Sequence, residues 1–399
     1  MEHNILDSVD PRVVGRELQE ARRRARLTQE DAAAVLEVKR TTITAIEKGD
    51  RRLRADELIK LARAYERPVS DFVRPRPALE PFLRAQFRGP SSLTDDDKNT
   101  IQPYIDELED LCRNYVEIET IVASPLARKY QPEYVIANLP LEQAAESIAL
   151  EERNRLGLGD GPLPILRNVL EQDVGLRIFY LPLPQKFSAI YFYTDPAGGC
   201  IAINSDHPEE RRRWSLAHDY CHFLSSRYDS TILVEEGYQR RPLSERLADS
   251  FAFYFLMPTA GLTRRYNDIV RTGKLTMGDL CSLANYYGVS VDALMQRLES
   301  MGLLKTGFWD ALRRRGVKVR EVQQQLGLQP IPAQDSKLPL RYRQLALDAL
   351  GDGQINLGHF ARLLNVDLIE AREISDALQL DPTQTIEASA HSLASTVDA

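Results

Sequence analysis

The chain has 399 residues, of which 43% are hydrophobic and 27% are charged, and this composition excludes a wholly disordered protein. Its length predicts two or three domains, and no apolar run is long enough to span a membrane. The net charge of −7 argues against a nucleic-acid binder, but the charges are unevenly distributed. Residues 1–78 hold 17 Lys and Arg against 14 Asp and Glu, whereas the remaining residues hold 34 against 44. The N-terminal part is therefore mildly basic and the rest of the chain is acidic.

Residues 13–75 predict a compact all-helical unit, which begins with a helix whose apolar residues recur at helical spacing. Thr28 is a favourable N-cap for the second helix, and Asp31 follows three residues later. Gly49 stops the third helix. After the first helix, the predicted helices cover residues 29–36, 39–48, 55–65 and 69–73.

Beyond this unit, prolines and glycines predict a stiff linker, and helical patterns then alternate with a short stretch of strands. The turn-forming residues 195–199 lie between two strand-like runs and predict a hairpin. From residue 276 the pattern predicts helices again, and it predicts a frayed tail from residue 384. The predicted helices are 96–122, 141–156, 165–174, 208–225 and 244–256, and the predicted strands are 176–181, 189–193 and 200–203.

The second and third helices have the layout of a DNA-reading helix-turn-helix. At the exposed start of the third helix, Arg40 can contact guanine edges and the threonines can contact thymine methyl groups, while Gln29 and Thr42 suit phosphate contacts. The candidate DNA-binding residues are Gln29, Lys39, Arg40, Thr41, Thr42 and Thr44, and the arginines expected to add long-range attraction are Arg22, Arg23 and Arg26. The alternative is an ordinary helical bundle whose arginines form a solvated face.

Residues 13–73 resemble the Xre (Cro/cI) family of helix-turn-helix repressors. The resemblance rests on Leu27-Thr28-Gln29-Glu30 and on Ile43-Thr44-Ala45-Ile46-Glu47-Lys48-Gly49. It implies that residues 39–45 read the major groove and that Gln29 contacts the DNA backbone. It also implies a double-stranded DNA operator as partner and leaves a homodimer open, because family members usually bind paired half-sites as dimers.

Two of the six histidines, His218 and His222, lie four residues apart on a predicted helix and therefore share a face, as two ligands of one metal ion do. A hydrolytic zinc site takes three protein ligands, and Glu245, near the start of the next helix, is the natural third. The alternative is that both histidines are core residues. We interpret Cys221, between them, as a packing residue.

The surroundings of His218-Asp219-Tyr220-Cys221-His222 resemble the ImmA/IrrE family of metallopeptidases from about residue 165 to 305. The stretches that carry the resemblance are residues 201–206, 211–217, 245–258, 283–290 and 297–299. The resemblance implies a zincin-like α+β domain with Zn²⁺ held by His218, His222 and Glu245, and a repressor or other regulatory protein as substrate. The family has HExxH with glutamate as general base, whereas this chain has Asp219 at that position.

Asp219 divides two possible functions. If its carboxylate serves as the catalytic base, the chain is a DNA-binding transcription regulator whose zinc metallo-endopeptidase domain cleaves a regulatory protein. If its shorter reach disables catalysis, the domain is a non-catalytic metal-binding sensor that responds to a ligand or partner. Asp249, one turn beyond Glu245, is expected to orient a ligand histidine, and the alternative is a solvated helix charge.

Together these patterns predict a mostly helical α+β protein with four parts. The parts are a helix-turn-helix domain over 1–75, a Pro-rich linker over 76–100, a metallopeptidase-like domain with a small β-sheet over 101–305, and a helical region with a frayed tail over 306–399. Two later helix pairs, over residues 280–298 and 360–371, also resemble helix-turn-helix units and could contact DNA. They carry few basic residues, so we interpret them as structural or dimer packing elements. The polar N-terminus and four scattered cysteines favour a cytoplasmic protein. The lack of a long apolar run favours no membrane partner, and the two family resemblances imply a bacterial source.

Overall fold

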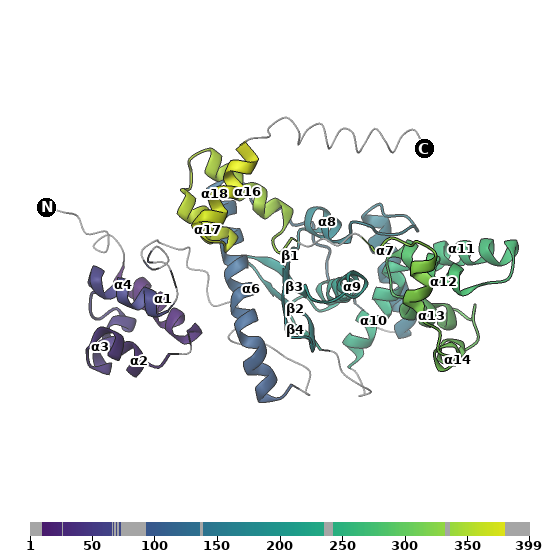
Figure 1. The fold of residues 1–399 in the computed structure, drawn as a ribbon, viewed down its shortest axis with the longest axis horizontal. Helices are drawn as coiled ribbons and strands as arrows, with labels where there is room; N and C mark the ends of the chain where they lie inside the picture. The colour runs from purple at the N-terminus through teal and green to yellow at the C-terminus, as the bar shows by residue number, and fades with distance from the viewer. Residues whose placement is uncertain are drawn as a thin grey trace. The chain divides into compact units, whose positions relative to one another are not determined.

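The computed structural model describes residues 10–25, 27–65, 67, 69, 72, 93–135, 139–234, 242–331 and 336–379. The chain divides into two compact units, residues 1–80, here called the head, and residues 81–399, here called the body. In the described residues the chain is mostly helical with one four-stranded sheet, which is the predicted α+β class (Figure 1). No described helix has the length and hydropathy that a membrane crossing requires.

The head contains four described helices, and their boundaries follow local signals in the sequence. Thr28 accepts a hydrogen bond from the Asp31 backbone amide while the Asp31 side chain accepts one from the Thr28 amide, so the second helix begins with a capping box. Gly49, at φ 77°, ends the third helix in the left-handed region that favours glycine. The predicted helix over 69–73 lies mostly outside the described residues. The four helices are α1 (Pro11–Arg24), α2 (Gln29–Leu36), α3 (Arg40–Lys48) and α4 (Ala55–Ala64).

A close approach between α1 and α3 fixes the packing of the head. A Cβ atom at Gly15 would lie 2.7 Å from the Glu47 carbonyl oxygen and closer still to that of Ile46, so only glycine lets the two helices meet at this distance. The core beneath them is built from small and branched residues, and includes Leu18, Ala32, Ile43, Ile46 and Leu58.

The sheet of the body has the strand order β1-β3-β2-β4. The predicted hairpin is confirmed, because β2 and β3 pair antiparallel, for instance Ala189 opposite Ile203. β1 runs parallel to β3, and β4 pairs antiparallel with β2 at the sheet edge. Sequence patterning missed β4, which has only four residues. The strands are β1 (Arg177–Leu181), β2 (Phe187–Thr194), β3 (Gly198–Asn204) and β4 (Thr231–Val234).

One face of the sheet is covered by a long helix and by the helices at the C-terminal end of the described chain. Leu108 of α6, Phe179 of β1, Ile190 of β2 and Tyr342 of α16 belong to one buried cluster, so segments more than 200 residues apart share a core (Figure 1). The helices on this face are α6 (Asp95–Ile121), α16 (Leu340–Gly351), α17 (Leu357–Leu364) and α18 (Leu368–Gln379).

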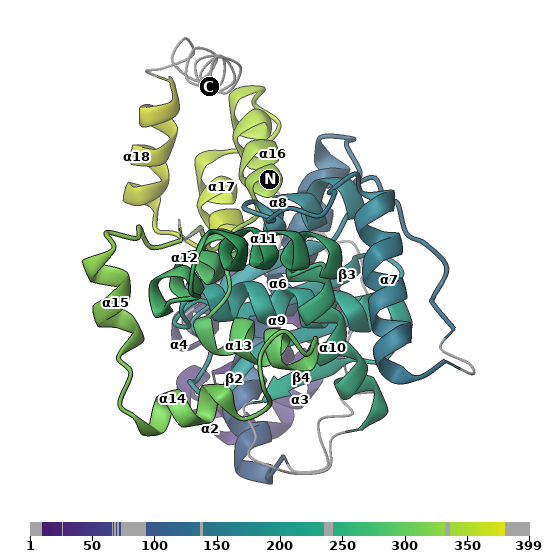
Figure 2. The same cartoon turned by 90° about the vertical axis from the view of Figure 1, so that its right-hand side faces the viewer.

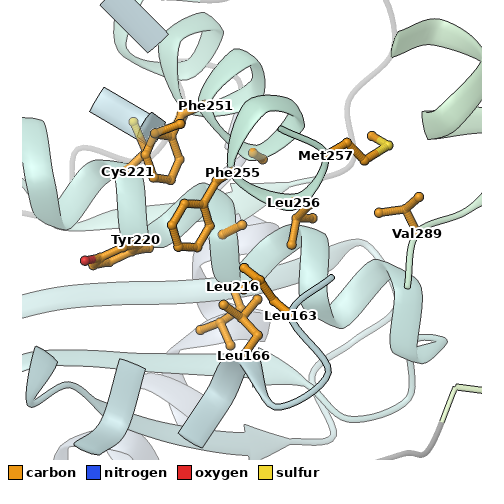
Figure 3. Close-up of a cluster of buried hydrophobic side chains, with 14 of the residues drawn as sticks. Leu163, Leu166, Leu216, Tyr220, Cys221, Phe251, Phe255, Leu256, Met257 and Val289 are labelled. Carbon is orange, nitrogen blue, oxygen red and sulfur yellow. The ribbon is translucent and has the colours of Figure 1, made fainter. Parts of the chain in front are cut away.

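The opposite face of the sheet is covered by α9, which is enclosed by further helices and is therefore buried on several sides. Figure 3 shows the aromatic centre of this core, where Tyr220 and Cys221 of α9 lie beside Phe251 and Phe255 of α10. The helices of this layer are α7 (Leu141–Arg155), α8 (Leu166–Val169), the π-helix η2 (Leu170–Val174), α9 (Glu209–Ser225), α10 (Leu243–Leu256), α11 (Thr259–Thr272), α12 (Met277–Tyr287), α13 (Val291–Ser300), α14 (Phe308–Arg314) and α15 (Val319–Gln325).

Candidate metal centre and nucleic-acid interface

The helices α9 and α10 present a ladder of three side-chain pairs to each other. The residue numbers rise by four on α9 while they fall by four on α10, as expected for antiparallel helices whose facing side chains recur every turn. One end of the ladder is an aromatic pair with ring centroids 4.4 Å apart, and the other two pairs are polar. The pairs are Trp214 with Phe253, His218 with Asp249, and His222 with Glu245.

The two polar pairs bring three potential metal ligands together. His218 Nε2 lies 3.2 Å from His222 Nε2 and 3.3 Å from Glu245 Oε2, and His222 Nε2 lies 3.1 Å from Glu245 Oε1. A tetrahedral zinc site with ligand distances near 2.0 Å has edges of about 3.3 Å between ligand atoms. The observed spacing therefore fits two imidazole nitrogens and a carboxylate around one metal ion.

Asp249 selects the ring nitrogen that His218 presents to this centre. Its Oδ1 lies 3.1 Å from His218 Nδ1. An ionised carboxylate can only accept, so the Nδ1–H of His218 donates to Asp249. Nε2 is then the nitrogen that faces His222 and Glu245, and it offers its lone pair to a metal ion once the ring is neutral.

The charge balance of the centre favours a cation between the three side chains. Burial disfavours the charged imidazolium of His218, but hydrogen bonds with Asp249 and Glu245 outweigh this effect and raise its pKa to about 10. Burial acts to raise the pKa of Glu245, but the hydrogen bonds and charges of His218 and His222 outweigh it and hold this pKa well below its usual value. Burial lowers the pKa of His222. A divalent cation bound here would displace the proton that His218 otherwise holds.

Asp219 is a buried carboxyl group next to this centre. It is 1% exposed, and neither of its oxygens has a hydrogen-bond partner among the described residues. Burial raises its pKa to about 7, an effect that the charge of His218 opposes and the charge of Glu245 strengthens. Buried carboxyl groups in structural roles are normally hydrogen-bonded, so an unpartnered one beside a ligand set is a candidate for proton transfer.

Solvent reaches the centre from the side of α10. The Glu245 and Asp249 side chains are 26% and 27% exposed, whereas those of His218 and His222 are at most 2% exposed. The centre is therefore reached over α10 rather than through the core around α9.

The candidate DNA-binding residues in the head differ in exposure. Lys39, Arg40 and Thr41 are exposed at the start of α3, whereas Thr42 and Thr44 are half-buried. Gln29 is held inside a network, because its Nε2 donates to Glu47 Oε2 at 2.9 Å and its Oε1 accepts from Thr44 Oγ1 at 3.2 Å and from Arg40 Nε at 3.4 Å. The structure thus brings Gln29 to the side chains that would face DNA.

Arg22 corrects one expectation from the sequence. It is 7% exposed, and its Nε donates to Glu47 Oε1 at 2.6 Å. Because its charge is paired inside the head, it belongs to the packing between α1 and α3 and adds little long-range attraction. The Arg23 side chain and Arg26 lie outside the described residues.

The two later helix pairs bury their apolar faces within the body. Leu283 of α12 and Leu294 of α13 lie in the core around α9, and Phe360 of α17 and Ala371 of α18 lie in the core around α6. These contacts agree with the packing interpretation.

The sequence analysis missed the aromatic pair of Trp214 and Phe253. The four-residue spacing of positions 214, 218 and 222 and of positions 245, 249 and 253 could have indicated it, because residues at this spacing share one helix face.

Two family models match the chain. The model described as Helix-turn-helix matches residues 18–72, and the model described as IrrE N-terminal-like domain matches residues 171–299. The second match includes the sheet, α9 and α10, and therefore every residue of the candidate metal centre. No curated protein matches the chain. The fusion expected from the sequence, a helix-turn-helix region followed by an IrrE-like domain, is confirmed.

Proposed function

We propose that this chain, which joins a helix-turn-helix region to an IrrE N-terminal-like domain, is a DNA-binding transcription regulator whose body is a zinc-dependent peptidase acting on a regulatory protein. The observation that carries the peptidase proposal is Asp219, a buried carboxyl group without a described hydrogen-bond partner beside the three candidate ligands. A non-catalytic sensor needs the ligands but has no use for such a group.

In this proposal His218, His222 and Glu245 hold the metal ion. A zinc ion, when bound, supplies Lewis acidity toward a peptide carbonyl and acidifies a coordinated water. The ligand set of two histidines and one glutamate belongs to known hydrolytic zinc sites, where an open position remains for water or substrate.

Other side chains of the body orient a ligand, transfer the proton and bind the peptide. Asp249 holds the His218 ring in the tautomer that presents Nε2. Asp219 accepts the proton of the attacking water on a carboxylate oxygen and returns it to the leaving amine. β4 lies at the edge of the sheet, and such an edge suits an extended peptide that adds as a further strand.

The head supplies the sequence-specific contacts with DNA. Arg40 is exposed and reaches a guanine edge in the major groove, while Lys39 and the threonines of α3 contact phosphates and methyl groups. Gln29 restrains Arg40 through its side-chain oxygen and contacts the DNA backbone itself. A protein that binds such an operator is expected in the cytoplasm. A homodimer on paired half-sites remains a prediction.

Arg40→Ala is expected to weaken binding to an operator selected from random DNA by about 5- to 150-fold, because a good base contact contributes about 1–3 kcal/mol. Binding to unselected DNA should fall less, since there Arg40 contributes only its charge. Fluorescence anisotropy with both duplexes at one salt concentration measures the difference. An equal loss on both would show that Arg40 does not read bases.

The peptidase proposal is tested with a peptide library prepared from a digested bacterial lysate, incubated with the zinc-loaded protein and analysed for new N-termini. The wild-type chain should produce cleavages that His218→Ala abolishes. Asp219→Asn should slow them by about 10²–10⁴-fold, because it keeps the size of the side chain and removes the base.

The same experiment separates the peptidase from the sensor. If the wild-type chain leaves the library intact while Asp219→Glu cuts it, the aspartate is too short for catalysis and the site is non-catalytic. If neither protein cuts while both bind zinc, the sensor is again favoured.

A further inference from the structure

A cluster of positively charged residues lies within a short stretch of the otherwise acidic body. Residues 79–399 hold 34 Lys and Arg against 44 Asp and Glu, yet residues 305–320 hold six cations and one acid, Asp310. The cations, here called the basic surface, are Lys305, Arg313, Arg314, Arg315, Lys318 and Arg320.

The basic surface is built on α14, α15 and the turn between them, which are anchored on α12 and α13. Trp309 is buried, and its Nε1 donates to Asp292 Oδ1 at 2.6 Å. The amides of Gly307 and Trp309 donate to the Glu299 carboxylate at 3.0 and 2.8 Å. Figure 2 shows α14 and α15 on the outer side of α12 and α13. The segment is therefore a fixed part of the body.

The cations of the basic surface are exposed and only partly neutralised. All six are exposed. Arg313 pairs with Asp310 at 3.1 Å and with Asp292 at 3.3 Å, and Lys318 pairs with Glu321 at 2.7 Å. Within the described part of the chain, no ion pair is formed by the other four, which are Lys305, Arg314, Arg315 and Arg320.

Unpaired like charges this close together repel one another, so they indicate a polyanionic partner. Five of the cations fall within residues 313–320, a stretch that spans at most about 28 Å. Duplex DNA carries about one charge per 1.7 Å of its axis, so several phosphates lie within reach. Protein partners favour surfaces with an apolar centre, whereas Phe308, 38% exposed, is the one large apolar side chain described as exposed among residues 305–320.

We propose that the basic surface binds the phosphate backbone of duplex DNA and forms a second DNA contact, separate from the head. It contributes a sequence-independent attraction, because exposed Arg and Lys side chains neutralise phosphates whatever the base pairs are.

The test uses the full chain with Lys39→Ala and Arg40→Ala in every sample, so that the head is weakened throughout. The probe is a 40-base-pair duplex of mixed sequence, and anisotropy is measured from 50 to 200 mM NaCl. The variant R314Q/R315Q/R320Q should flatten the slope of log K against log[salt] by about 2 to 3, since each phosphate contact contributes about 0.9. Its affinity at the lowest salt should fall by about 10-fold or more.

A matched control variant is R271Q/K274Q/R372Q, which removes the same charge from exposed positions elsewhere in the body. It should leave the slope nearly unchanged. Equal slopes for the two variants would overturn the proposal. It would also be overturned if R314Q/R315Q/R320Q weakened binding of poly-L-glutamate but not of DNA, because an acidic protein would then be the partner. Unchanged melting of Trp fluorescence checks the fold, since Trp309 lies next to the substitutions. Because the head is weakened in all samples, either outcome leaves its proposed role untouched.

Discussion

Replacing His222 with glutamine is expected to weaken zinc binding by more than about a hundredfold, so that the dialysed protein retains almost none of the roughly one ion per chain expected for the wild type. His222 Nε2 faces both His218 Nε2, at 3.2 Å, and Glu245 Oε1, at 3.1 Å. Its loss leaves two protein ligands where a zinc site needs at least three. Elemental analysis by mass spectrometry, with competition against a chromophoric chelator, gives the content and the affinity.

Two further variants test whether zinc binding depends on this centre. Asp249→Asn removes the carboxylate that receives the Nδ1–H of His218 and should weaken zinc binding by about 10–100-fold without abolishing it. His359→Ala is the matched control, because His359 is also buried but pairs with Glu117 of α6 at 2.9 Å. Unchanged zinc in His222→Gln would contradict the assigned centre, and so would an equal loss in His359→Ala. Circular dichroism establishes that each variant is folded.

Glu119→Ala is expected to destabilise the body by about 3 kcal/mol, because it leaves buried positive charge uncompensated. The Glu119 carboxylate pairs with Arg177 at 2.6 Å and with Arg341 at 2.7 Å, and thereby connects α6 with β1 and α16. The Arg177 side chain is 1% exposed and the Glu119 side chain is 6% exposed. Urea unfolding followed by Trp fluorescence measures the body alone, since both tryptophans, Trp214 and Trp309, lie in it.

Two comparisons test the reason given for this loss. Asp268→Ala breaks an exposed pair with Arg271, whose side chains are 61% and 80% exposed, and should cost less than about 0.5 kcal/mol. Arg177→Met combined with Glu119→Leu should be less destabilised than the sum of the single variants, because the buried charges are removed together. A loss for Glu119→Ala no larger than that for Asp268→Ala would show that the buried network contributes little.

The elements that sequence patterning predicted well are those specified by nearby residues. The Thr28 and Asp31 capping box, the Gly49 stop and the hairpin of β2 and β3 depend on contacts within a few residues. β4 was missed because four residues carry too little periodicity, and its place depends on pairing with β2 some 40 residues earlier. The π-helix η2 lies at the end of the helix predicted over 165–174, where the spacing of apolar residues alone does not distinguish a π turn from an α turn.

The sequence by itself determined which residues are candidates for the metal centre and the DNA contact: two histidines one turn apart, a glutamate on the following helix, and a basic, capped helix pair in the first 75 residues. Helical spacing is a local property, so these features needed no tertiary contact. The tertiary structure decided which groups meet. It placed Glu245 and Asp249 opposite the histidines, paired Arg22 with Glu47, and left Asp219 buried without a described partner. Such facts depend on how α9 packs against α10 and α1 against α3, and packing between distant segments is set by the whole core.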